Sequence, residues 1–249
     1  MSNFVKKFER NSEGRDFAVG DIHGHFSRLE AALMSIKFDP SHDRLFSVGD
    51  LVDRGPESER ALGYIDMPWF HAVRGNHEDM AIRWPAGNMD AGNYVANGGA
   101  WNVSNPPFAA QAISDALSML PIAIEVETSS GTVGIVHADC PFPTWRDFVV
   151  SLDDSGMSNK MRKLVFEAAL WSRERIQSED RSGIPDVRAV IVGHTPLKHT
   201  VVLGNVYHID TGGWTRDGKF TLLELDSLVA HYANEVLDWN AHTTTEAGK

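Results

Sequence analysis

The segment Phe17–His25, with the sequence FAVGDIHGH, decides how this chain is interpreted. It begins as an apolar run typical of buried strands, and it continues into Asp21 and His23, each next to a glycine. We expect these two side chains, at i and i+2 of an extended strand, to project from one face and to bind one ion. The segment therefore predicts a strand that leads into a metal site.

Four later segments also place a metal-binding side chain at the end of a β-prone run. The donors are Asp50, Asn76, His137 and His194, in the segments 44–50, 69–76, 132–139 and 188–195. Together with Asp21 and His23 they exceed what one tetrahedral site uses, but they suit two adjacent ions with one bridging carboxylate and water in the remaining positions. The sequence therefore predicts a two-metal hydrolase.

Helical patterns lie between these strands. The apolar stripes are Phe26, Leu29, Leu33 and Ile36 in residues 26–36, and Met161, Leu164, Val165 and Ala168 in residues 159–176. Alternation of strand and helix predicts a largely parallel sheet, in which the loops at the carboxyl ends of the strands gather in one crevice. Residues 123–139 resemble a hairpin, and residues 201–213 and 219–227 resemble closely connected strands joined by a glycine-rich turn. We therefore predict an α/β fold with two packed mixed sheets flanked by helices.

The chain has no Ser/Gly linker, repeat or low-complexity run, so residues 1–249 are interpreted as a single domain. Its core is expected over about residues 15–228, with a flexible tail over about residues 240–249. The Gly- and Asn-rich stretch 87–102 is interpreted as a loop over the site, and the alternative is a surface connection without a role.

Composition excludes several classes of protein. A formal charge of −11 disfavours nucleic acid as a partner, because a surface that binds a phosphate backbone needs clustered Lys and Arg. The single cysteine, Cys140, excludes an internal disulfide, and we interpret it as a packed bystander rather than a nucleophile. Neither a signal peptide nor a bilayer-spanning run is recognisable, so we expect a cytoplasmic protein without a membrane partner.

Three blocks, GDIHGH at 20–25, GDLVDRG at 49–55 and RGNHE at 74–78, precede His137 and then GHTP at 193–196. In this order they resemble the phosphoprotein phosphatase family, and in particular its bacterial and phage members, which are similar to lambda phosphatase. The resemblance covers about residues 15–215 and implies the calcineurin-like metallophosphoesterase fold. Each block taken alone is weak, but five blocks in the family order are specific.

The resemblance implies how the ligands divide between two divalent metal ions. Asp21, His23 and Asp50 would hold the first ion, and Asp50, Asn76, His137 and His194 would hold the second, with Asp50 as the bridge. Mixed nitrogen and oxygen donors without thiolate suit manganese, the expected metal, with iron or zinc as alternatives.

The catalytic roles also follow from the resemblance. A hydroxide activated by the two metals would attack phosphorus directly, while His77 protonates the leaving oxygen and Asp53 orients the imidazole. The guanidinium groups of Arg54 and Arg74 would bind the phosphoryl oxygens, although either could instead pair with Asp50 or Glu78. A further arginine would come from the WSRER stretch, where Arg173 is preferred over Arg175.

The predicted activity is hydrolysis of phosphomonoesters on proteins or peptides, at serine or threonine and also at tyrosine, with small phosphate esters as further substrates. The main alternative is a dinucleoside polyphosphate hydrolase, which the retention of His23 and Asp53 disfavours. A nuclease is disfavoured by the acidic balance. A non-catalytic phosphate-binding module is disfavoured because the ligand set and His77 are complete.

Overall fold

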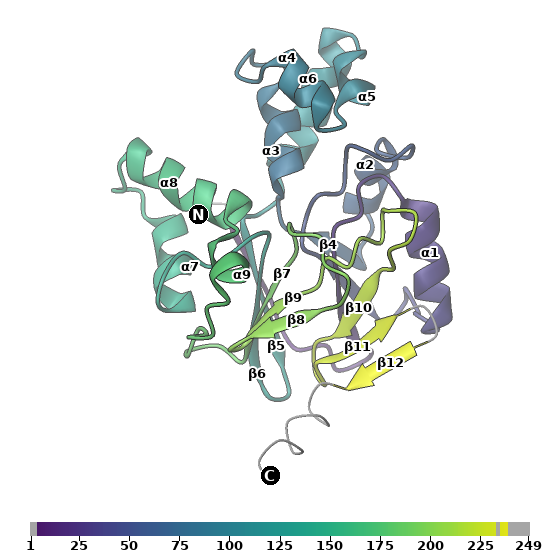
Figure 1. Ribbon diagram of the computed structural model, residues 1–249, viewed down its shortest axis with the longest axis vertical. Helices are drawn as coiled ribbons and strands as arrows, with labels where there is room; N and C mark the ends of the chain where they lie inside the picture. The colour runs from purple at the N-terminus through teal and green to yellow at the C-terminus, as the bar shows by residue number, and fades with distance from the viewer. Residues whose placement is uncertain (1–3, 233–234, 239–249) are drawn as a thin grey trace.

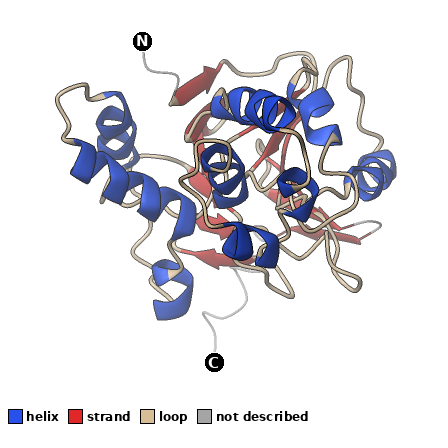
Figure 2. Cartoon of the chain, turned by 90° about the horizontal axis from the view of Figure 1, so that it is seen from above, coloured by secondary structure: helices blue, strands red, loops and turns tan. Residues whose placement is uncertain are grey.

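The computed structural model describes residues 4–232 and 235–238. Its strands form two mixed six-stranded sheets that face each other, with helices on their outer sides (Figures 1 and 2). The first sheet has the order β1 (Val5–Phe8), β5 (Ala123–Thr128), β6 (Gly131–Val136), β7 (Ala189–Val192), β9 (Val206–His208), β8 (Val201–Leu203). The second has the order β12 (Glu235–Asp238), β11 (Val229–Tyr232), β10 (Thr221–Glu224), β2 (Asp16–Val19), β3 (Arg44–Ser47), β4 (Phe70–Ala72).

Three neighbouring parallel strands lie in the middle of the first sheet and along one side of the second, where β4 is the edge strand. Strands β2, β3 and β4 are parallel neighbours in the second sheet, and β6, β7 and β9 are parallel neighbours in the first. The expected hairpin is present as the antiparallel pair β5–β6, and β8–β9 forms another. The predicted fold of two mixed sheets flanked by helices is therefore confirmed.

The helices cover the sheets in three groups (Figure 1). They are α1 (Phe26–Ser35) and α2 (Arg60–Ile65); α3 (Asn76–Arg83), α4 (Ala91–Ala96), α5 (Ala100–Val103) and α6 (Pro107–Ser118); and α7 (Trp145–Asp153), α8 (Asn159–Trp171) and α9 (Glu174–Ser178). Alternation along β2 divides its side chains between two cores. Phe17 and Val19 pack with α1 residues, whereas Ala18 lies in the layer between the sheets.

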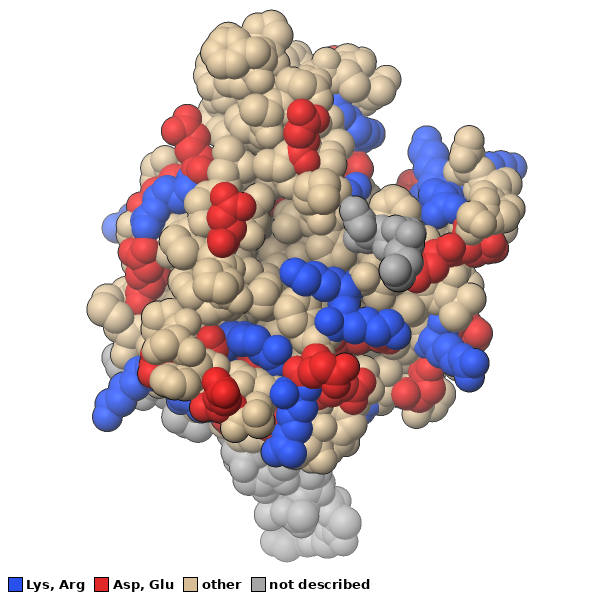
Figure 3. Space-filling view, turned by 180° about the vertical axis from the view of Figure 1, so that it is seen from behind, with Lys and Arg blue, Asp and Glu red and all other residues tan. Residues whose placement is uncertain are grey.

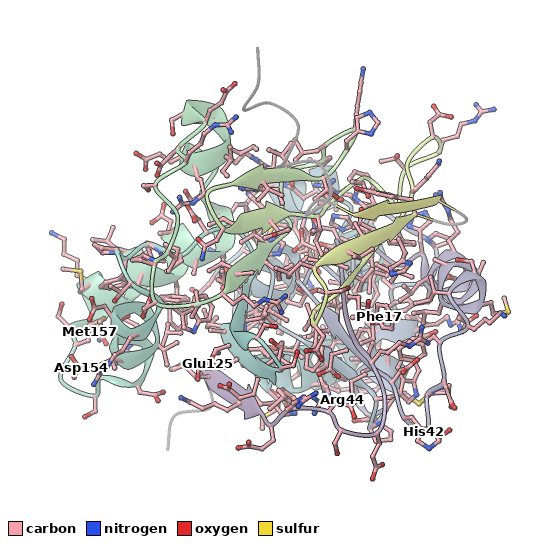
Figure 4. The ribbon with its side chains drawn as sticks, turned by 90° about the horizontal axis from the view of Figure 1, so that it is seen from below. Phe17, His42, Arg44, Glu125, Asp154 and Met157 are labelled. Atoms are coloured by element: carbon pink, nitrogen blue, oxygen red, sulfur yellow. The ribbon has the colours of Figure 1, made fainter. Side chains whose placement is uncertain are left out.

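A third hydrophobic core, separate from the two that β2 contributes to, packs α7 and α8 against the first sheet. Trp145 and Phe148 of α7 are buried there with Val190 of β7. The indole of Trp145 donates a hydrogen bond of 3.0 Å to Glu125 of β5, a residue labelled in Figure 4. In the same view Asp154 and Met157 mark the loop that leads from α7 into α8, on the side of the molecule away from His42.

Several local expectations were wrong. Residues 159–176 are not one helix, because α8 ends at Trp171 and the chain is extended at Ser172 before α9 begins. Met161 and Leu164, which were expected on a buried stripe, are about half exposed, at 51% each. The stretch 87–102 contains the short helices α4 and α5 rather than only a loop.

The glycine-rich turn after β9 connects β9 to β10, as expected from the sequence, but these two strands do not pair. It carries the chain from β9 in the first sheet to β10 in the second. The single-domain interpretation stays a prediction, and the expected tail at about 240–249 lies outside the described residues. Within the described residues, no helix has both the length and the apolar character needed to cross a membrane.

Candidate active site

The six expected metal ligands converge from both sheets. Each lies one to four residues beyond the carboxyl end of a parallel strand, where the topology gathers the connecting loops. All are buried: Asp21 and His23 after β2, Asp50 after β3, Asn76 after β4, His137 after β6 and His194 after β7. Residues that are distant in sequence thus come within a few ångströms of one another.

One group of donors surrounds the imidazole of His23. Its Nε2 lies 3.6 Å from Asp50 Oδ2 and 3.9 Å from Asp21 Oδ2. Its Nδ1 lies 3.0 Å from the carbonyl of Val52, so we assign the proton to Nδ1 and the lone pair to Nε2. Burial lowers the pKa of His23 well below its usual range, which also favours the neutral ring. A lone pair facing two carboxylates is an arrangement that a cation would stabilise.

The second group of donors meets around His137. Its Nδ1 is 2.7 Å from the carbonyl of Val48, which leaves the lone pair on Nε2. That atom faces Asn76 Oδ1 at 2.9 Å, Asp50 Oδ1 at 3.4 Å and His194 Nδ1 at 3.2 Å. Four nitrogen and oxygen atoms that can bind a metal therefore converge in a buried space. Burial lowers the pKa of His137, but the charge of Asp50 and the hydrogen bonds to Asp50 and Val48 together outweigh it and raise the pKa, so a positive charge is favoured here.

These contacts fit two divalent cations that share Asp50. Among the His, Cys, Asp and Glu side chains of the described residues, two buried groups could hold a metal ion. One is His23, Asp50 and His77, and the other is Asp50, His137 and His194, so Asp50 belongs to both. Burial alone would raise the pKa of Asp50, but the surrounding imidazoles, His137 foremost, hold it well below its usual range. The carboxylate is therefore ionised and has two oxygens to share.

The backbone of the site is strained. The described residues contain eight non-glycine residues with positive φ, and five of them belong to the predicted site. They are His23 at 44°, Asp50 at 51°, Asp53 at 70°, Arg54 at 66° and His194 at 66°. Such conformations each cost about 1–3 kcal/mol and persist only where the surroundings impose them. The expectation that Asp21 and His23 lie within a strand was wrong, because β2 ends at Val19 and both follow in the turn.

Glu78 holds two of the ligand loops together, a role that sequence reasoning missed. Its fully buried carboxylate accepts hydrogen bonds from the backbone N–H groups of Asp50, Leu51 and Gly75 at 2.8 Å each, and from Val52 at 3.3 Å. Burial and the nearby charge of Asp50 raise the pKa of Glu78 to about 7, while the backbone donors oppose that rise. The carboxylate thereby fixes the loop after β3 to the start of α3.

His77 and Asp53 form a buried pair beside the metal ligands. His77 Nδ1 lies 2.7 Å from Asp53 Oδ2, and the indole N–H of Trp101 donates to Asp53 Oδ1 at 2.7 Å. His77 Nε2 faces Asp50 Oδ2 at 3.9 Å and the Nη2 of Arg54 at 3.2 Å. Asp53 therefore fixes the orientation of the His77 imidazole, with Nε2 directed toward the metal ligands. Trp101 therefore contacts the site through Asp53.

The four candidate arginines lie in different surroundings. Arg54 is exposed next to His77. Arg74 donates through Nη2 to the carbonyls of Ser118 and Leu120 at the end of α6, so this nitrogen is already occupied by backbone acceptors. Arg175 is buried in ion pairs with Asp139 at 2.9 Å and Asp180 at 3.2 Å. Arg173 remains exposed, and its charge contributes to lowering the pKa of His194, an effect dominated by burial.

Two further residues at the site were not identified from the sequence. Asp210 follows β9 as Asp21 follows β2, and it is buried next to Asp21. Burial raises its pKa to about 6. The signal was present in the segment HIDTG, where an acid ends a strand as in the earlier blocks. Trp214, in the turn after β9, contacts both His23 and Arg54.

Comparison with known proteins agrees with this geometry. The family model for calcineurin-like phosphoesterases matches residues 17–211. Serine/threonine-protein phosphatase 1 of Salmonella typhimurium is 37% identical over 212 residues, which are 84% of this chain and 91% of that protein. A symmetrical bis(5'-nucleosyl)-tetraphosphatase of Serratia proteamaculans is 42% identical over 64 residues, only 25% of this chain and 23% of that protein. The crystal structure of a cold-active protein-tyrosine phosphatase of a Shewanella species has a similar fold, with a TM-score of 0.58 at 17% identity over 95% of this chain and 82% of that one.

Proposed function

Because this chain belongs to the calcineurin-like phosphoesterase family, we propose that it is a metal-dependent serine/threonine protein phosphatase. One observation carries the proposal: the buried His77–Asp53 pair lies beside Asp50, the carboxylate that belongs to both groups of possible metal donors. The similarity to a serine/threonine phosphatase along 84% of the chain supports the substrate class. On the face shown in Figure 3, basic and acidic side chains are interspersed, which offers no support for a nuclease.

The proposed ligands of the two ions are those named from the sequence. Asp21, His23 and Asp50 would hold one ion, and Asp50 with Asn76, His137 and His194 would hold the other. When bound, two divalent ions supply Lewis-acid polarisation of phosphoryl oxygens and ionisation of water near neutral pH. The hydrogen bonds from His23 to Val52 and from His137 to Val48 orient these rings with a lone pair toward the ions.

His77 is the proposed general acid. Asp53 accepts a hydrogen bond from its Nδ1–H and stabilises the protonated ring, so that Nε2–H can give a proton to the leaving alkoxide. In this structure Arg54 Nη2 can only donate, so His77 Nε2 accepts and carries no proton. Proton donation therefore requires Arg54 to move off Nε2, as it would when its guanidinium binds a phosphoryl oxygen. Arg173 is the proposed second cationic contact.

The experiment that tests the function compares substrates under added manganese, alongside measurement of bound metal. We expect turnover of phosphoserine and phosphothreonine peptides, with about two metal ions per chain. Faster hydrolysis of diadenosine tetraphosphate than of any phosphopeptide would favour the alternative activity, for which the short similarity to a tetraphosphatase is the specific observation. A metal-loaded protein that hydrolyses neither class, or that binds only one ion, would contradict the proposal.

The role of His77 has its own test. His77→Asn should lower kcat by about 10²- to 10⁴-fold for alkyl phosphates, whose leaving oxygen needs a proton. The loss should be smaller for 4-nitrophenyl phosphate, and metal content should stay near that of the wild type. Full turnover of an alkyl phosphate by His77→Asn would remove the acid role.

A further inference from the structure

Trp214 contacts both a proposed metal ligand, His23, and a proposed phosphate-binding residue, Arg54. It belongs to the turn between β9 and β10, the yellow-green segment that runs toward α1 in Figure 1. Its ring centroid is 4.8 Å from that of His23 in an edge-on contact, and the Arg54 guanidinium lies 4.5 Å from it. The indole is partly buried, and within the described residues its buried N–H has no hydrogen-bond acceptor. Its hydrogen-bonding group therefore does not hold the ring in place.

The position of the ring is set by the turn. Arg28 of α1 donates to the carbonyl of Thr215 at 2.5 Å and to that of Gly218 at 3.0 Å. The Thr215 hydroxyl donates to the carbonyl of Gly212 and accepts from the N–H of Gly218. A Cβ at Gly218 would lie 1.9 Å from the Gly212 oxygen, so only glycine fits there. Trp214 thus stands on a segment closed by its own hydrogen bonds and attached to α1.

Arg54 is an exposed side chain with few restraints. Besides Trp214, its side chain contacts His77 Nε2 at 3.2 Å, and its backbone N–H donates to Gly98 at 3.3 Å. A free arginine side chain loses rotamer entropy when it is fixed on a ligand. A cation held over an indole face is restrained before the ligand arrives, and tryptophan is the strongest of the aromatic partners.

We propose that Trp214 is a positioning residue: it keeps the Arg54 guanidinium over its indole face, from where the guanidinium can turn from His77 Nε2 to a phosphoryl oxygen of a bound substrate. The proposal rests on the proposed function, because it is that function which gives Arg54 a phosphate to bind. Trp214 then contributes to phosphate affinity and KM through Arg54. It contributes much less to kcat, and metal binding does not depend on its contact with His23.

The test measures the affinity of the metal-loaded protein for inorganic phosphate by calorimetry, together with kcat, KM and bound metal. Trp214→Leu should weaken phosphate binding and raise KM by about 5- to 30-fold, as expected for loss of a partly desolvated cation–π contact. Trp214→Phe, which keeps an aromatic face, should recover most of the loss. Trp69→Leu, at a partly buried tryptophan packed against the core near α2, is the matched control and should leave phosphate affinity unchanged.

A double-mutant cycle with Arg54→Ala separates this role from a merely structural one. If Trp214 acts through Arg54, Trp214→Leu should have almost no further effect in the Arg54→Ala background. Additive losses, or loss of metal from Trp214→Leu, would overturn the proposal. Phosphate affinity is measured without turnover, so a protein that shows the coupling but hydrolyses no phosphopeptide would contradict the proposed function and leave the placement of Trp214 intact.

Discussion

Replacing Trp101 with phenylalanine removes one hydrogen bond to the carboxylate behind His77 and keeps most of the ring. The Trp101 indole donates to Asp53 Oδ1 at 2.7 Å, while His77 occupies Oδ2. A hydrogen bond to a buried charge contributes about 1.5–3 kcal/mol. Tyr94 also interacts with Asp53, so we take the lower end of that range. About 1.5 kcal/mol corresponds to a loss of about tenfold in rate.

The assay compares two leaving groups. We expect Trp101→Phe to lower kcat about tenfold for phenyl phosphate or a phosphoserine peptide, because a less well-oriented His77 protonates the leaving oxygen more slowly. With 4-nitrophenyl phosphate, which needs little protonation, the change should be below about threefold. Trp69→Phe, another tryptophan at the edge of the same core cluster, is the control and should change neither rate. Equal losses with both substrates, or none with either, would refute the role assigned to this hydrogen bond.

Three further predictions concern residues outside the metal ligands. Phe26→Ala should lower the free energy of unfolding by about 3–5 kcal/mol in urea titrations, since Phe26 is fully buried against Tyr64, whereas Phe108→Ala, at a ring that is 78% exposed, should change it by less than about 0.5 kcal/mol. Burial, with nearby cationic side chains, lowers the pKa of His71 from 6.5 to about 3, so the stability that its neutral form contributes is complete above pH 6.5 and is lost as the pH falls toward 3. His71→Phe should flatten this part of the curve of unfolding free energy against pH. A His71 resonance that titrates near pH 6.5 in the folded protein would contradict this prediction. Burial raises the pKa of the Cys140 thiol to about 12, so a disulfide reagent at about pH 8 should label one thiol in urea and none in the native protein; rapid native labelling would show that the side chain is accessible.

The sequence predicted those strands that are apolar runs followed directly by a turn with a polar side chain. Strands β2, β3, β4, β6 and β7 lie where their apolar runs placed them, since a buried strand in a parallel sheet needs an unbroken apolar stretch. The convergence of their carboxyl ends followed from the topology alone. That is why Asp50 and His137, distant in sequence, could be assigned to one pocket before their contact was known.

Other features depend on tertiary contacts that periodicity does not reveal. The break between α8 and α9 lets Arg175 turn inward to Asp139, and a helical stripe contains no sign of that ion pair. Arg74 was assigned by its position two residues before Asn76, but the nearby end of α6 offers it carbonyl groups. From the sequence, Glu78 was considered only as a possible partner of Arg54 or Arg74. Its four backbone donors become apparent only once the loop after β3 folds over it.

The donors of the site are divided between the two halves of the sandwich. Asp21, His23, Asp50 and Asn76 follow strands of the second sheet, whereas His137 and His194 follow strands of the first. A cation ligated from both sides would act as a clamp that keeps the layers in register. By mass action, ligation and closure of the sandwich would then favour each other. Chelation would therefore do more than abolish turnover. It would weaken the packing of the two sheets against each other, and the melting temperature would depend on the concentration of free metal.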